Sequence, residues 1–129
     1  MRGLIGALVL TAAPLAWSAE EPKPLPPAEA AKKVNERVTV EMAVKAVGKN
    51  KAGDMYFLNS EEDYKSPNNF TIVLRKGALE KLRDDKIDPT EHYAGKTVRA
   101  TGTVKTYMDR PEIVVENPAL LSVIEKKEK

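Results

Sequence analysis

The chain has 129 residues, with 21 Lys and Arg against 19 Asp and Glu. Its formal net charge of +2 provides no strong field that would draw the chain to nucleic acid or to an acidic membrane surface. Because it has no cysteine and one histidine, the sequence excludes disulfides, thiolate zinc sites, cysteine nucleophiles and sites built from several histidines. No metal ion and no cofactor is expected.

The first 18 residues have the three-part pattern of a signal peptide. Arg2 provides a positive start, residues 3–15 are almost entirely apolar, and Ala16 and Ser18 put small residues at the positions that precede a cleavage site. The apolar run is short for a bilayer span. We therefore expect cleavage after Ser18 and a periplasmic or secreted protein with no membrane span after processing. A retained anchor or a buried helix is the alternative.

The remaining chain is long enough for one domain with its own core, and not for two. Residues 19–27 contain four prolines, which favour an extended spacer. The domain is expected over residues 28–124, followed by a charged tail at residues 125–129. Residues 28–34 are Ala-rich and follow a proline, which predicts a short N-terminal helix, and Asn35 suits its end.

Alternation of apolar and polar residues predicts five strands and an all-β fold. The expected strands cover residues 37–47, 55–59, 70–75, 98–105 and 111–116, and residues 120–124 extend or follow the last of them. A helix is expected over residues 77–86, between the third and fourth strands, because Leu79 and Leu82 are three residues apart. Residues 60–69 are polar and contain a proline, so a loop is expected there.

The faces of these strands predict the core. Nine side chains are expected to be buried together: Val38, Val40, Val44, Phe70, Ile72, Leu74, Val98, Val104 and Ile113.

Three stretches resemble a known family by their order and spacing. The first is residues 38–40, which enter a long strand. The second is residues 53–59 followed by residues 70–74. The third runs from the Tyr-Ala-Gly-Lys of residues 93–96 to Pro118. Together they resemble small secreted proteins with the oligonucleotide/oligosaccharide-binding fold, the OB-fold, and OB domains of the tRNA-anticodon-binding type.

This resemblance implies a five-stranded OB barrel with a helix between strands three and four. The chain departs from the family in its first strand. Met42 stands where a glycine often lets that strand bend, while Gly102 keeps the equivalent place in strand four. The first strand must therefore bend elsewhere, with Gly48 as the candidate, unless the register differs.

The resemblance also implies a ligand site on strands two and three and on the loops joining strands one to two and four to five. The candidate ligand-binding residues are Lys49, Lys51, Tyr56, Arg75, Tyr107 and Arg110. Tyrosines can stack on bases, and Lys or Arg can meet phosphate. Core aromatics and edge lysines are also ordinary features of a barrel that binds nothing.

We expect a non-catalytic, exported binding module whose partner is a protein, peptide or small ligand in the cell envelope. The alternative is weak, sequence-tolerant binding of single-stranded nucleic acid. No catalytic residue is assigned, because His92 suits a surface or capping role and the sequence has no Gly-rich phosphate loop and no nucleophile elbow. The acidic runs at residues 61–63 and 84–88 lack the ligand spacing of a calcium loop.

Overall fold

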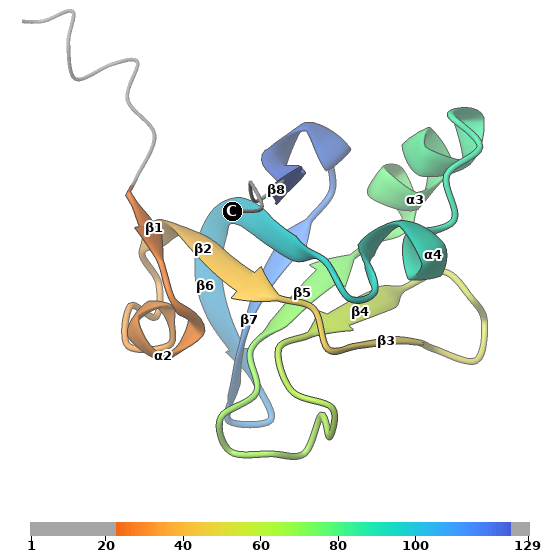
Figure 1. Ribbon diagram of the computed structural model, residues 1–129. Helices are drawn as coiled ribbons and strands as arrows, with labels where there is room; N and C mark the ends of the chain where they lie inside the picture. The colour runs from red at the N-terminus through yellow and green to blue at the C-terminus, as the bar shows by residue number, and fades with distance from the viewer. Residues whose placement is uncertain (1–22, 125–129) are drawn as a thin grey trace, which may run out of the picture.

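The computed structural model of the protein describes residues 23–124, so the expected signal peptide and the charged tail lie outside the described residues. In chain order the elements are β1 (Pro24–Leu25), α2 (Pro27–Ala30), β2 (Arg37–Ala43), β3 (Ala46–Lys49), β4 (Tyr56–Asn59), β5 (Thr71–Leu74), α3 (Lys76–Asp84), α4 (Pro89–Tyr93), β6 (Thr97–Tyr107), β7 (Arg110–Val115), the 3-10 helix η2 (Pro118–Leu120) and β8 (Leu121–Ile124) (Figure 1). Over this range, no helix combines the length and the apolar character needed to cross a membrane.

The strands pair in the order β1-β2-β6-β7-β5-β4-β3, and β8 adds to β6. The β1–β2 and β5–β7 pairs are parallel, and the others are antiparallel. The chain is therefore mostly β and OB-like, as expected. The expectation of a closed barrel of five strands is wrong in two respects. The described chain has eight strands, and the pairing path is open because no ladder joins β3 to β2.

The first expected strand, residues 37–47, is split into β2 and β3. At the break, the Val44 amide donates to the Lys96 carbonyl (2.8 Å) and the Lys45 amide donates to the Asn59 carbonyl (2.9 Å). Successive residues thus bond to opposite neighbours, and the chain turns from the β6 side of the sheet to β4. Gly48 lies within β3, so the bend expected there is instead at Val44 and Lys45.

The remaining two strands are β1 and β8, and β8 lies within residues 120–124, which were expected to extend or follow the last strand. β1 lies in the expected Pro-rich spacer, yet it pairs with β2, and Leu25 packs against the core. β8 follows η2 and pairs with β6. The expected N-terminal helix is reduced to the single turn of α2, and Asn35 is left-handed with φ of 72°.

Two helices, α3 and α4, stand where one was expected. Lys86 has a φ of 60°, which ends the first, and the Asp88 carboxylate starts the second by accepting from the Thr90 amide (3.0 Å). Both lie between β5 and β6 in sequence, at the end of the sheet away from α2 (Figure 1).

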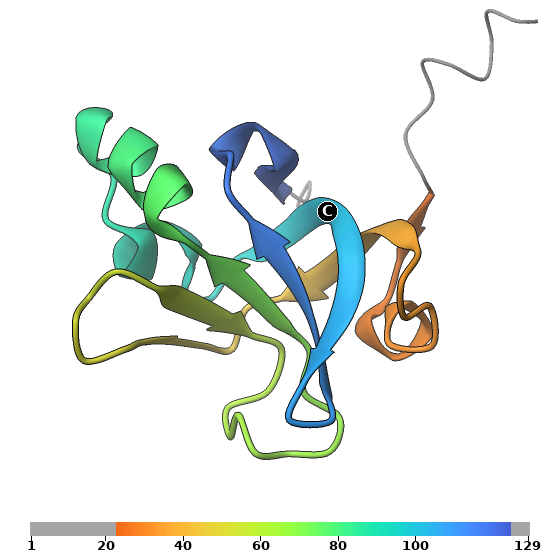
Figure 2. The ribbon, with the colours of Figure 1, turned by 180° about the vertical axis from the view of Figure 1, so that it is seen from behind.

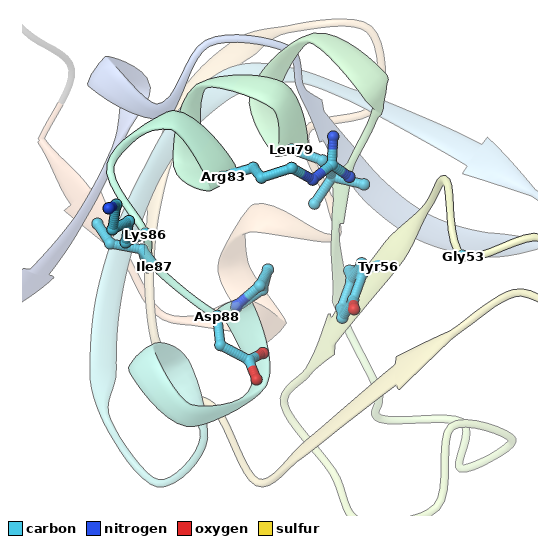
Figure 3. A pocket seen from close by; sticks show the side chains of 8 residues that line it. Gly53, Tyr56, Leu79, Arg83, Lys86, Ile87 and Asp88 are labelled. Carbon is cyan, nitrogen blue, oxygen red and sulfur yellow. The ribbon is translucent and has the colours of Figure 1, made fainter.

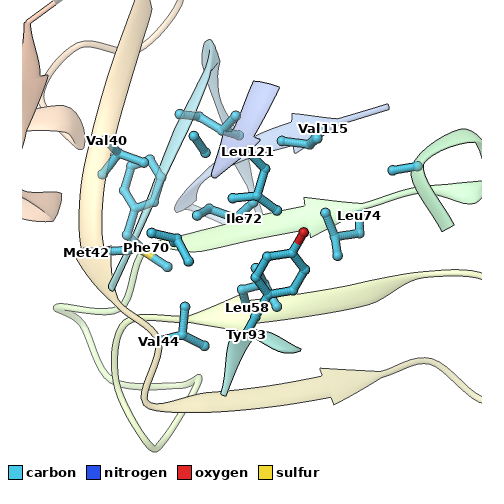
Figure 4. Close-up of a cluster of buried hydrophobic side chains, with 14 of the residues drawn as sticks. Val40, Met42, Val44, Leu58, Phe70, Ile72, Leu74, Tyr93, Val115 and Leu121 are labelled. Carbon is cyan, nitrogen blue, oxygen red and sulfur yellow. The ribbon is translucent and has the colours of Figure 1, made fainter. Parts of the chain in front are cut away.

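The core is confirmed at all nine expected positions, each of which is buried. Figure 4 labels five of them, which are Val40, Val44, Phe70, Ile72 and Leu74. Phe70 is the largest of the fully buried side chains, and Tyr93 of α4 packs into the same cluster. Burial raises the pKa of the Tyr93 hydroxyl. Gly102 is required for close packing, because a Cβ there would lie 2.7 Å from Cγ2 of the buried Ile113.

Candidate ligand-binding groove

A groove of about 430 Å³ lies on the outer face of the sheet. Its walls include the loop between β4 and β5 and the turn between β6 and β7, which both views place at the same end of the molecule (Figures 1 and 2). The lining residues are Gly48, Lys49, Phe57, Asn59, Tyr64, Thr71, Tyr107, Met108, Arg110, Pro111 and Glu112.

The floor of the groove follows from strand parity. In β4, Phe57 and Asn59 alternate with the fully buried Leu58, so their side chains lie on the face opposite the core. Thr71 of β5 pairs with Asn59 on one side and with Glu112 on the other. The sheet thus presents a row of polar residues next to the ring of Phe57.

The rim of the groove is unusually apolar for an exposed surface. Tyr64 is 58% exposed, Tyr107 66% and Met108 78%. Among residues 23–124, these three are the most exposed of the large hydrophobic side chains, and all three line this groove. Scattered exposed hydrophobic residues need no explanation, but a cluster around one concavity is typical of a binding site.

A buried amide network holds the loop that carries Tyr64. The Asn69 Nδ2 donates to Asn59 Oδ1 (3.1 Å), to Thr71 Oγ1 (3.1 Å) and to the Tyr64 carbonyl (3.4 Å). Its Oδ1 accepts from the Glu61 amide (3.0 Å). Since Asn69 is only 3% exposed, these bonds join the loop to the floor of the groove away from competing water.

The charged groups of the groove are few and of both signs. The Arg110 Nη1 donates to the Tyr64 carbonyl at 3.4 Å, which links the β6–β7 turn to the opposite wall. Burial raises the pKa of the Glu112 carboxyl, while the positive charge of Arg75 acts in the opposite direction. A further negative charge beside Glu112 would raise this pKa more, because a like charge disfavours the ionised carboxylate.

The structure brings three of the six candidate residues to this groove: Lys49, Tyr107 and Arg110. The Lys49 ammonium itself lies 5.8 Å from the centroid of the Tyr56 ring. The other three candidates, Lys51, Tyr56 and Arg75, are not among the lining residues.

Tyr56 lies in a separate concavity of about 330 Å³ between β4 and the helices (Figure 3). Its neighbours there include Leu79, Arg83 and Ile87. Lys51 is exposed in the β3–β4 turn, and Arg75 directly precedes α3.

The six candidate residues do not include Tyr64, Met108, Phe57 or Glu112, which also line the groove. Tyr64 had one available signal, which is an aromatic residue within an otherwise polar loop. Met108 sits at the tip of a hairpin, where no periodic pattern applies. Within the described part of the chain, no group of three or more His, Asp or Glu side chains is arranged to hold a metal ion.

No protein-family model matches the sequence, and a search of curated proteins found no match. Solved structures are similar in fold. A putative aspartyl-tRNA synthetase from Leishmania major Friedlin matches with a TM-score of 0.55 at 15% identity, covering 87% of this chain and 22% of that one. The asparaginyl-tRNA synthetase from Pyrococcus horikoshii matches with a TM-score of 0.53 at 20% identity, covering 78% and 23%.

A third similar structure is the OBody AM1L10 bound to hen egg-white lysozyme, with a TM-score of 0.53 at 17% identity, covering 84% of this chain and 100% of the OBody. The chain therefore spans less than a quarter of each synthetase but the whole of the OBody. At these identities the similarity shows the fold alone. The expected resemblance to OB domains of the tRNA-anticodon-binding type is confirmed at that level.

Proposed function

We propose that the protein is a non-catalytic binding module and that its groove holds part of a protein, peptide or small ligand in the cell envelope. The observation that carries this proposal is the gathering of Tyr64, Tyr107 and Met108 around one groove. Tyr, Met and Arg are enriched at protein interfaces, and Tyr and Arg are frequent hot spots. The rim supplies all three residue types, with Arg110 as the cation.

The charge of the groove favours such a ligand over a polyphosphate. Binding of a nucleic acid strand depends on several Lys or Arg side chains that neutralise phosphates. Here Arg110 is accompanied by the Glu112 carboxylate, and the Lys49 ammonium lies over Tyr56. The OBody that is similar in fold is bound to a protein, lysozyme.

Weak, sequence-tolerant binding of single-stranded nucleic acid is the second candidate. It is favoured by the two exposed tyrosines, because a base stacked on an aromatic ring contributes about 1–3 kcal/mol whatever its sequence. It also agrees with the similarity in fold to two tRNA synthetases.

Peptide panning followed by titration separates the two candidates. A library of random peptides is panned on the protein. The strongest peptide and a mixed-sequence single-stranded oligonucleotide are then labelled and titrated by fluorescence anisotropy. The double variant Tyr64→Ala/Tyr107→Ala should weaken peptide binding by roughly tenfold or more, since it removes two exposed rings from the rim. The control Val34→Ala/Leu120→Ala removes exposed apolar side chains outside the groove and should leave binding unchanged.

Salt dependence gives the second readout. For a single strand, the logarithm of the binding constant should fall with the logarithm of the salt concentration, with a slope of about −0.7 per contacted phosphate. Binding of a peptide need show no such slope. A steep slope for the oligonucleotide, together with weaker oligonucleotide binding in the Tyr64→Ala/Tyr107→Ala variant, would favour the nucleic-acid candidate. Failure of both probes to bind would refute the binding role of the groove.

We also propose that the protein is exported. This rests on Arg2, the short apolar run and the small residues Ala16 and Ser18. Mass spectrometry of the protein from the exported fraction should show an N-terminus at Ala19 or Glu20. An intact Met1 terminus would contradict it.

A further inference from the structure

Met108 is the most exposed of the large hydrophobic side chains that the structure describes. It occupies the two-residue turn between β6 and β7 with Asp109, where φ is 52° for Met108 and 66° for Asp109. This left-handed pair is a common hairpin geometry, but it usually contains Gly or Asn. The sequence therefore places a long thioether where a small or polar residue is the normal choice.

The three described methionines differ strongly in their access to solvent. Met42 is 3% exposed within the core (Figure 4). Met55 is half-buried next to β4, and Met108 is 78% exposed at the rim of the groove. Because methionine oxidation depends on exposure of the sulfur, Met42 and Met55 serve as less exposed references for the oxidation of Met108 in the same chain.

We propose that Met108 is a site of oxidation by hydroperoxides and that its oxidation weakens ligand binding at the groove. This inference rests on the proposed function of the groove. The sulfur lone pair attacks the transferable oxygen of the hydroperoxide, the O–O bond breaks and an S–O bond forms. The thioether loses two electrons and becomes the sulfoxide. The peroxide is reduced, and its proton moves to the departing oxygen, which leaves as water or an alcohol.

The consequence for binding follows from the change in polarity. Met108 lies with Tyr107 and Pro111 at the rim, where a ligand would cover its side chain. A sulfoxide is polar and chiral, and it disrupts interfaces that rely on methionine. A buried methionine side chain contributes apolar contact area that a sulfoxide cannot replace without loss. We expect the oxidised protein to bind about tenfold more weakly.

Selectivity of oxidation is tested first, on the folded protein treated with hydrogen peroxide. Peptide mass spectrometry should find one added oxygen atom on Met108 well before Met55 and Met42 react. Equal rates at the three positions, or earlier reaction of Met55 or Met42, would overturn the inference. This readout needs no ligand, so it can fail while the proposed function stands.

The effect on binding is then measured with the labelled peptide from panning. Wild-type protein should lose affinity after peroxide, and methionine sulfoxide reductase should restore it. For each protein, the affinity after peroxide is compared with the affinity of the same protein before peroxide. Met108→Leu should therefore show no loss on peroxide treatment, even if its initial affinity differs from that of the wild type. Unchanged affinity of the oxidised wild type, or an equal loss in Met108→Leu, would overturn the proposal that oxidation of Met108 weakens binding. Absence of peptide binding before oxidation would instead overturn both the proposed function and the proposed effect of oxidation on binding.

Discussion

Replacement of Phe70 by alanine should lower the free energy of unfolding by about 3–5 kcal/mol, the range for truncating a buried phenylalanine. Phe70 is fully buried directly before β5 and is the largest such side chain in the core. Its removal loses apolar burial and leaves a cavity in the core cluster, which the neighbouring side chains can only partly fill. Urea denaturation monitored by circular dichroism measures the change.

Tyr64→Ala is the matched control, because it also truncates an aromatic side chain but at a position 58% exposed. It should change stability by no more than about 0.5 kcal/mol, as is usual for surface positions. Similar losses in the two variants would mean that Phe70 is not in the core and that the parity of β5 is reversed.

Replacement of Asn69 by alanine should also be costly, although it removes no large apolar group. The amide of Asn69 bonds to Asn59, Thr71 and the Tyr64 carbonyl, and it accepts from the Glu61 amide. Leaving a buried polar partner unsatisfied costs about 1–3 kcal/mol, so we expect a loss of stability in that range. The loop that carries Tyr64 should also lose its fixed position, which weakens binding at the groove.

Asn68→Ala provides the comparison. Asn68 is the same residue type at the adjacent position, but it is exposed. Its replacement should affect neither stability nor binding measurably. A loss in Asn68→Ala as large as in Asn69→Ala would show that the loop is sensitive to any change rather than held by the buried network.

The core could be predicted from the sequence because burial imposes a period of two on each strand. Val38 and Val40 of β2 and Ile72 and Leu74 of β5 belong to the core cluster. Thr39 and Val73, which lie between them, are buried but are not part of that cluster. The rule fails across the break after Val44. Val44 belongs to the core, and the next residue that packs against the core is Val47. These two residues are three positions apart, whereas an uninterrupted strand would place residues two or four positions apart on the same face. A pattern read through this point assigns Ala46 to the wrong side.

The same limitation explains the partial success at the candidate site. The sequence Tyr56-Phe57-Leu58-Asn59 is apolar on both faces, so alternation alone cannot decide whether Tyr56 or Phe57 faces the ligand. Pairing decides it, because Leu58 lies opposite Ile72 in the core and Phe57 therefore faces outward. Tyr107 and Arg110 could be predicted, since they close a hairpin whose place in the OB-fold is known from the resemblance.

Strand β1 and the position of Tyr64 could not be predicted, because each depends on contacts that an alternating pattern does not indicate. Pro24 and Leu25 form β1 because they reach the exposed edge of β2, and a proline-rich sequence by itself indicates only extended chain. Tyr64 reaches the groove because the buried Asn69 side chain joins the Tyr64 carbonyl to Asn59 of β4.

Chemical-shift mapping by ¹H–¹⁵N NMR tests most directly whether the groove is the binding site. The labelled protein is titrated first with the peptide obtained by panning and then with the single-stranded oligonucleotide. The largest shifts for the bound ligand should fall on the amides of Phe57, Tyr64, Thr71, Met108 and Arg110, which surround the groove. Shifts centred instead on Tyr56, Leu79 and Ile87 at the helix end of the molecule, or no saturable shifts with either ligand, would contradict this account.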